Sequence, residues 1–312
     1  MEGSIFQYDF ILKGLLGAIF ASITAGIIGT YIVTRKMVFL SGGITHASFG
    51  GIGIGYYAGI NPVVGAAIFG VLSALGIEYL SLHHRIREDS AIGILWAFGM
   101  AVGIIFIYLT PGYSPNLMSY LFGSILTVTT ADIIALGIMS LILLIYFGAF
   151  YRTILYTSFD EQFARTYSAY VNIFKYITTS LVALTIVLNI RMAGVILVLS
   201  LLTIPPNIAL LFTRTYSRII LFSILSGFTG TAVGYMISYF AGIPAGATII
   251  FTLVIIWILV KGIIVSVAYF KKERPESVEP SIHRTVQPST LRTVDPSNPS
   301  PSTRTNTNQI NT

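Results

Sequence analysis

The sequence predicts an all-α polytopic membrane protein with about nine transmembrane helices. Hydrophobic residues make up 54% of the 312-residue chain and charged residues only 10%, and the mean hydropathy is +0.82, far from the averages of soluble domains. Long apolar runs, such as 133–150 and 249–260, approach or reach the length of about 20 residues that crosses a bilayer. Most Lys and Arg residues lie between these runs.

The apolar runs divide into nine expected spans. They cover residues 10–34, 39–59, 62–81, 91–110, 131–151, 172–189, 194–212, 217–240 and 246–270. Basic residues gather in alternate connections, at Arg35, Lys36, Arg85, Arg87, Arg152, Arg165, Lys175, Arg214, Arg218, Lys271, Lys272 and Arg274, whereas the other connections hold only Lys13 and Arg191. Because cytoplasmic loops carry the excess of Lys and Arg, we expect the N-terminus outside and the C-terminus in the cytoplasm.

The chain divides into a transmembrane domain, residues 1–272, and a cytoplasmic tail, residues 273–312. The tail is rich in Ser, Thr, Pro and Asn, so we expect it to be disordered. The first residues lack a basic segment, and no separable signal peptide is expected. The connection 111–130 is too long and apolar for a plain external loop, and a partial helix packed at the outer membrane face would fit it.

The second span is rich in glycine and contains one histidine. Small residues recur there at every fourth position: Gly43, Ala47, Gly51, Gly55 and Gly59. Such spacing lets another helix approach closely in lipid. An ionisable side chain inside a span is costly unless it faces the protein interior or water, and imidazole is a common ligand of zinc, iron and nickel. We hypothesise that His46, with Ser41 and Thr45 nearby, lines a metal pathway; the alternative is a hydrogen-bonded packing histidine.

The connection 157–170 predicts a short amphipathic helix on the cytoplasmic side. The residues assigned to it are Phe159, Asp160, Glu161, Phe163, Ala164 and Tyr167. Its aromatic side chains fall on one helical stripe, and its two carboxylates lie where a helix start favours negative charge. This segment is either an ordinary interfacial helix or a coupling helix that docks into a groove on a cytoplasmic ATPase.

Two adjacent prolines, Pro205 and Pro206, interrupt the seventh span. Proline has no N–H group, so we expect a kink there that frees a carbonyl group. The kink could also act as a gate.

Several function classes lack the residues that they need. The chain contains no G-x-x-x-x-G-K-[ST] motif for a P-loop and no H-E-x-x-H motif, and nothing in it supports an enzyme. The absence of cysteine excludes disulfides and thiolate metal ligands. Glu78 is the only acidic residue well inside the expected spans, which argues against a proton- or sodium-coupled carrier. The net charge of +6 follows from topology and does not indicate nucleic-acid binding.

Several segments share motifs with one known family. They are SGGITHASFGG (41–51), EDSAIGILWAFGMAVG (88–103), LFGSILTVTTAD (121–132), FDEQFARTY (159–167), RMAGVILVLSLLTIPPNIA (191–209) and GIPAGATII (242–250). Together they resemble the membrane permeases of zinc, manganese and iron ABC importers, over about residues 10–270. The resemblance implies a divalent metal ion as transported substrate, no permanently bound cofactor, and a metal route lined by His46. It also implies a location in the plasma or inner membrane and three kinds of partner: a cytoplasmic ABC ATPase, an extracytoplasmic metal-binding protein and a second permease copy, as a homodimer or close heterodimer.

The chain departs from this family at one position. The family often has an aspartate four residues before the histidine, whereas this chain has Gly42 there. Either Ser41, Thr45, a carbonyl group or a partner chain completes the site, or the substrate differs from manganese or zinc. Two other functions stay open: a permease for a metal chelate, such as a siderophore or cobalamin, and a self-contained channel or secondary carrier.

Overall fold

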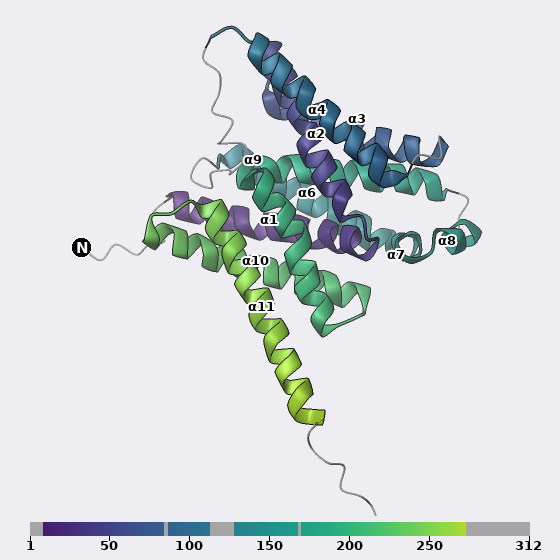
Figure 1. Cartoon of the computed structure of the whole chain (residues 1–312), viewed down its shortest axis with the longest axis vertical. Helices are drawn as coiled ribbons and strands as arrows, with labels where there is room; N and C mark the ends of the chain where they lie inside the picture. Colours follow the sequence, from purple (N-terminus) through teal and green to yellow (C-terminus); the bar gives the residue numbers. More distant parts are fainter. Residues whose placement is uncertain (1–8, 84–86, 113–127, 168–169, 273–312) are drawn as a thin grey trace, which may run out of the picture. The chain divides into compact units, whose positions relative to one another are not determined.

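The computed structural model describes residues 9–83, 87–112, 128–167 and 170–272, and every regular element in these ranges is a helix (Figure 1). The helices are α1 (Asp9–Thr34), α2 (Val38–Tyr57), α3 (Pro62–His83), α4 (Glu88–Leu109), α6 (Thr130–Ala149), α7 (Tyr151–Phe159), α8 (Glu161–Tyr167), α9 (Val171–Phe212), α10 (Tyr216–Ala241) and α11 (Ala245–Lys272). The predicted all-α class is confirmed for these ranges.

The chain forms two compact units, Met1–Ala268 and Tyr269–Thr312, and the packing described below belongs to the first. The predicted tail, 273–312, lies outside the described residues. Most of the 111–130 connection, where a partial helix is expected, also lies outside them.

Seven helices within the described ranges are long and apolar enough to cross a membrane, namely α1, α3, α4, α6, α9, α10 and α11. The sequence predicts about nine spans, and two helices account for the difference. The 20-residue α2 is absent from the seven, because its many Gly, Ser and Thr residues lower its hydropathy. The 42-residue α9 counts once, although it covers two expected spans, 172–189 and 194–212.

The chain reverses direction within α9 at Gly194. This residue has φ 79° and ψ 163°, a conformation that interrupts a helix and that glycine adopts readily because it has no Cβ atom. Three contacts with α1 surround the break: Asn189 with Thr24, Met192 with Gly17, and Leu202 with Gly29. Before Gly194, successive residues of α9 contact earlier and earlier positions of α1. After Gly194, the contact lies near the end of α1 again. The two halves of α9 therefore run in opposite directions beside α1.

Contacts between the other long helices show the directions in which these helices run relative to each other. The antiparallel pairs are α1 with α10 (Gly14 on Tyr235, Gly26 on Ile224), α2 with α3 (Gly51 on Gly65, Gly55 on Pro62) and α10 with α11 (Gly230 on Leu253, Gly234 on Ile249). The basic residues Arg35, Arg87 and Arg214 flank helices at one common end of this bundle, which we call the basic end, and Lys175 lies in the first turns of α9 at the same end. Arg191 lies at the opposite end.

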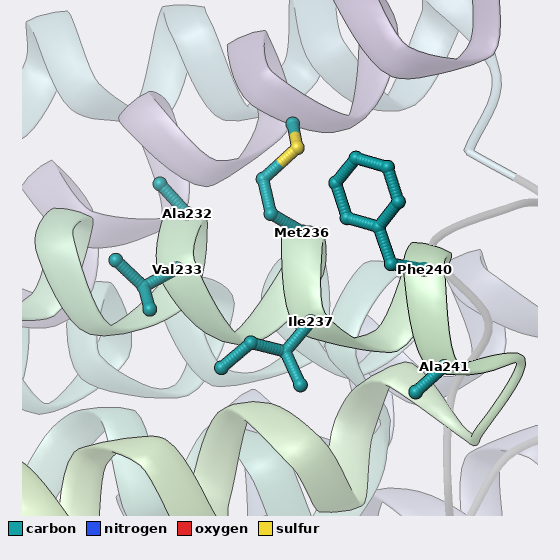
Figure 2. Close-up of a pocket in the computed structure, with 6 residues that line it drawn as sticks. All are labelled: Ala232, Val233, Met236, Ile237, Phe240 and Ala241. Carbon is teal, nitrogen blue, oxygen red and sulfur yellow. The ribbon is translucent and has the colours of Figure 1, made fainter.

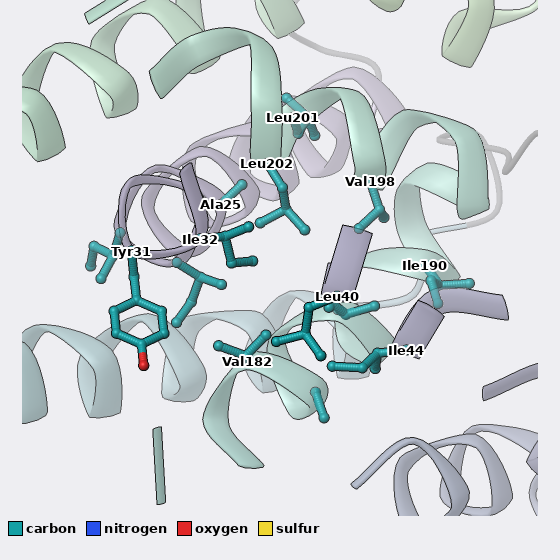
Figure 3. Close-up of a cluster of buried hydrophobic side chains, with 14 of the residues drawn as sticks. Ala25, Tyr31, Ile32, Leu40, Ile44, Val182, Ile190, Val198, Leu201 and Leu202 are labelled. Atoms are coloured by element: carbon teal, nitrogen blue, oxygen red, sulfur yellow. The ribbon is translucent and has the colours of Figure 1, made fainter. Parts of the chain in front are cut away.

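The helix α2 lies inside the bundle. The main cluster of buried apolar side chains joins α2 to α1 and α9, and Figure 3 shows Leu40 and Ile44 of α2 close to Val182, Ile190 and Val198 of α9. Fourteen of the 20 residues of α2 are buried, whereas the spanning windows of α4 and α11 are only 22% buried. A helix that contacts protein on most sides does not need apolar side chains to satisfy lipid, which explains the low hydropathy of α2.

Candidate functional site

The small residues of α2 let two neighbouring helices approach its backbone. Four members of the expected series face a neighbour: Gly43 faces Ile92, Ala47 faces Gly99, Gly51 faces Gly65 and Gly55 faces Pro62. A Cβ atom at Gly51 would collide with the carbonyl oxygen of Gly65 in α3. Sequence reasoning missed Gly53, which lies equally close to Gly103 of α4. The helix is therefore held between α3 and α4 by backbone contact.

Gly59, the last residue of the expected series, differs from the others. It follows the end of α2, its φ is 68°, and no atom lies within 4 Å of the position that a Cβ atom would occupy. Gly59 thus serves the turn between α2 and α3 through its left-handed backbone conformation rather than through helix packing.

His46 lies on the face of α2 that meets α4. Its imidazole is partly exposed and stacks on the indole of Trp96, with ring centroids 4.3 Å apart and ring planes inclined by 8°. Gly42, one turn earlier, faces the same indole, because a Cβ atom there would lie 3.4 Å from Cζ3 of Trp96. Position 42 and His46 therefore share one face of the helix, and that face carries no carboxylate.

Ser41 and Thr45 are buried beside His46, each at most 1% exposed. The hydroxyl of Ser41 donates to the carbonyl oxygen of Val38 at 2.7 Å, and that of Thr45 donates to the carbonyl oxygen of Ser41 at 2.5 Å. Both hydrogens are thus used within the helix, while the hydroxyl oxygens keep lone pairs that could accept a cation. Among the described residues there is no group of three His, Cys, Asp or Glu side chains that could hold a metal ion.

The expected coupling segment forms two short helices, so the single stripe from Phe159 to Tyr167 is interrupted. The helix α7 ends at Phe159, and Asp160 has extended backbone angles (φ −148°, ψ 100°). The Asp160 carboxylate accepts a hydrogen bond from the amide of Phe163 at 3.0 Å and so caps the start of α8. Phe159 and Phe163 are 62% and 50% exposed, whereas Ala164 is buried. Glu161 begins α8 and Tyr167 ends it.

Pro205 and Pro206 are buried inside the second half of α9. The only residue of α9 with non-helical backbone angles is Gly194, so the break in this helix lies there and not at the prolines. Pro206 cannot bond to the carbonyl oxygen of Leu202, because it has no N–H group, and this oxygen faces Gly29 of α1.

Two ion pairs of the structure were not predicted from the sequence. At the basic end, Nζ of Lys175 lies 2.8 Å from Oε1 of Glu78, and both side chains are at most 7% exposed. At the opposite end, Nε of Arg191 lies 2.9 Å from Oδ1 of Asp132, the residue that completes a capping box at the start of α6. The expected topology already placed the two members of each pair on the same side of the membrane. This was the only feature of the sequence analysis that could have suggested the two pairs.

An apolar pocket of about 600 Å³ lies along α10 (Figure 2). Its lining residues are Ala232, Val233, Met236, Ile237, Phe240 and Ala241. Apart from the thioether of Met236, a soft ligand, these side chains offer no ligand for a metal ion, and none of them comes from α2.

The chain is similar to known transport proteins along most of its length. The model of the ABC 3 transport family matches residues 7–264. The manganese transport system membrane protein MntC of Listeria monocytogenes is 33% identical over 259 residues, which cover 83% of this chain and 92% of that protein. A probable metal transport system membrane protein of Chlamydia pneumoniae is 36% identical over 250 residues, which cover 78% of this chain and 85% of that protein.

Solved structures have the same helical arrangement. PsaBC from Streptococcus pneumoniae, in complex with Fab, matches with a TM-score of 0.73 and 30% identity over 82% of this chain and 92% of that chain. An inward-facing putative metal-chelate type ABC transporter matches with a TM-score of 0.64 at 16% identity, over 82% of this chain and 85% of that chain, which shows a likeness of fold alone. The family match spans nearly all the membrane helices described above, and the chain therefore belongs to the ABC 3 transport family.

Proposed function

We propose that this chain is the membrane permease of an ABC importer for divalent transition-metal ions of the zinc, manganese and iron group. The observation that carries the proposal is the similarity to manganese transport membrane proteins, which extends over 83% of the chain. The permease moves the ion by alternating access, and a separate ATPase subunit supplies the energy.

The metal route runs past His46. Imidazole is a suitable ligand for zinc, iron and nickel, and this one is partly exposed on a helix that backbone contacts hold in place. Because Gly42 adds no carboxylate to the same face, one chain offers a single strong ligand there. A second copy facing the first would add a second imidazole, which favours a homodimer. The hydroxyl oxygens of Ser41 and Thr45, buried next to His46 in the same helix, are further candidate ligands.

The proposed membrane topology is supported by the reversal in α9 and by the position of the basic end. With α2 and both halves of α9 counted, nine spans result, and the contacts of α1, α2, α3, α9, α10 and α11 fit their alternating directions. The positive-inside rule places the basic end in the cytoplasm and the N-terminus outside. The cytoplasmic ATPase then meets α7 and α8, where Phe159 and Phe163 are exposed, and the external metal-binding protein meets the opposite end.

The metal content of cells tests this proposal. The host lacks its own metal importers and expresses the permease with its ATPase and binding protein, and Mn, Fe, Zn, Co and Ni are measured. We expect one metal to rise with the wild-type chain and to fall with His46→Ala. Ile94→Ala is the control. It truncates an exposed side chain of α4 and so reports the effect of a change on the exposed surface of the membrane helices.

The other possible outcomes change the proposed function in different ways. A rise that survives His46→Ala keeps the importer but makes His46 a packing residue. If no free ion rises, uptake of labelled siderophore or cobalamin tests the metal-chelate permease. Ion flux into liposomes that contain the permease alone would identify a channel or secondary carrier instead.

A further inference from the structure

The buried pair of Glu78 and Lys175 joins α3 to the first turns of α9. Their charged atoms are 2.8 Å apart, and the side chains are only 6% and 7% exposed. Thr179, one turn further along α9, donates to the second carboxylate oxygen at 3.5 Å. The pair is therefore enclosed by protein, and both helices contribute to its hydrogen bonding.

A buried ion pair is weak evidence for stability. Removing two charges from water costs free energy, and well-packed apolar residues often replace such a pair without loss of stability. The best-attested use of buried polar groups is to fix the register between helices. A slide of α9 along α3 would pull the two opposite charges apart inside the protein, where their attraction is screened less than in water.

The location of the pair links the register of α9 and α3 to two other helices, α8 and α2. Lys175 is the fifth residue of α9, and only residues 168–170 separate α9 from the short helix α8. Glu78 lies on α3, whose Gly65 touches the backbone of α2 at Gly51. A continuous series of contacts thus leads from α8 through the ion pair to α2, the helix that carries His46.

We propose that the pair of Glu78 and Lys175 fixes the axial register of α9 against α3, so that a displacement of α8 moves α3 and α2 without slippage. This inference rests on the proposed function, because it assigns α8 as the element that the ATPase moves. The two residues are assigned as positioning residues, because they act through the packing of α3 against α9.

The test removes or exchanges the charges in the assembled transporter, with its ATPase and binding protein. The apolar double variant Glu78→Met/Lys175→Met removes both charges of the pair at once, so the net charge is unchanged, and the exchanged variant Glu78→Lys/Lys175→Glu restores the pair in reverse. The control variant Arg87→Gln/Asp89→Asn removes an exposed pair at the same end, whose atoms are 3.7 Å apart and whose side chains are 85% and 73% exposed. Abundance in the membrane, melting temperature, metal uptake and ATP hydrolysis are measured for each variant.

We expect the apolar double variant to keep its abundance and melting temperature and to continue hydrolysing ATP, while uptake falls at least about fivefold, the lower end of typical coupling factors. The exchanged variant should recover uptake, and the control should match the wild type. Wild-type uptake in the apolar double variant would overturn the inference. Loss of that variant from the membrane would do so as well, because the pair would then serve folding.

A second measurement separates this inference from the proposed function. The chain has no cysteine, so a pair introduced at Ala66 and Ile190, which line one small cavity between α3 and α9, reports the register by disulfide cross-linking. We expect slower cross-linking in the apolar double variant even if the wild type transports no metal. Unchanged cross-linking would overturn the inference, whereas failure of wild-type uptake alone would overturn only the proposed function.

Discussion

The imidazole of His46 lies parallel to the indole of Trp96, with ring centroids 4.3 Å apart. The stack joins α2 to α4 at the face that Gly42 shares. An aromatic pair of this geometry contributes about 0.5–1.5 kcal/mol beyond the area that it buries, so Trp96 holds the ring of His46 in one orientation.

If the proposed metal route runs past His46, loss of this stack should weaken ion binding there. We expect Trp96→Ala to raise the half-saturating metal concentration for uptake by about two- to tenfold, the equivalent of the stacking free energy. Trp96→Phe keeps an aromatic face and should stay close to the wild type. Equal kinetics for the two variants would show that the orientation of His46 does not depend on the stack.

Backbone contact between α2 and α3 should make Gly51 intolerant of any side chain. Gly51→Ala pushes a methyl group against the carbonyl oxygen of Gly65 and should destabilise the protein by about 1–3 kcal/mol. Gly93→Ala on α4 is the matched control, because no atom lies within 4 Å of its added Cβ atom. Melting temperatures in detergent should fall for Gly51→Ala only, and a similar fall for both would mean that the close approach is not the cause.

Asp160 caps α8 through one carboxylate oxygen, and two substitutions separate this cap from any effect of the charge. Asp160→Asn retains an oxygen acceptor for the Phe163 amide and should preserve uptake, whereas Asp160→Ala loses the cap of α8, worth about 0.5–2 kcal/mol, and should reduce it. Reversal of charge at both Asp160 and Glu161 should abolish uptake but not membrane insertion. Normal uptake after that reversal would exclude a coupling role for this segment.

The positive φ of Gly194 makes this position sensitive to substitution. Gly194→Ala forces an L side chain into a conformation with φ 79° and should cost about 1–3 kcal/mol. Gly148→Ala, near the end of α6, has open space around the added Cβ atom and serves as the control. Thermal unfolding of the two variants in detergent measures the difference, and a melting temperature of Gly194→Ala equal to that of the control would exclude backbone strain at the turn.

Hydropathy and spacing predicted the parts of the fold that depend on local sequence. The expected spans 10–34 and 62–81 agree closely with α1 (Asp9–Thr34) and α3 (Pro62–His83), because each is a continuous apolar run between polar residues. The small-residue spacing also located the face of α2 that other helices approach, although Gly59 turned out to serve a turn. Periodicity identifies the face but does not say which helix meets it.

The features that sequence reasoning missed depend on residues far apart in the chain or on a single hydrogen bond. Glu78 and Lys175 are almost a hundred positions apart, and only the packing of α3 against α9 brings them together. The end of α7 depends on the capping bond of Asp160, which no hydrophobic pattern records. The break in α9 was expected, because it occurs at Gly194, at the junction of the expected spans 172–189 and 194–212, but the left-handed glycine that makes it was not. Pro205 and Pro206 remain inside a helix that α1 and α10 support.

The tight turn at Gly194 has a consequence for how the chain is made. It joins two long apolar segments without a polar loop between them, so neither segment has a hydrophilic stretch to be carried across the bilayer separately. We expect the two halves of α9 to enter the membrane together, as a helical hairpin, during synthesis. An epitope or glycosylation tag inserted beside Gly194 would therefore disturb insertion itself, and a reporter of topology in this region belongs near Arg214, at the next connection.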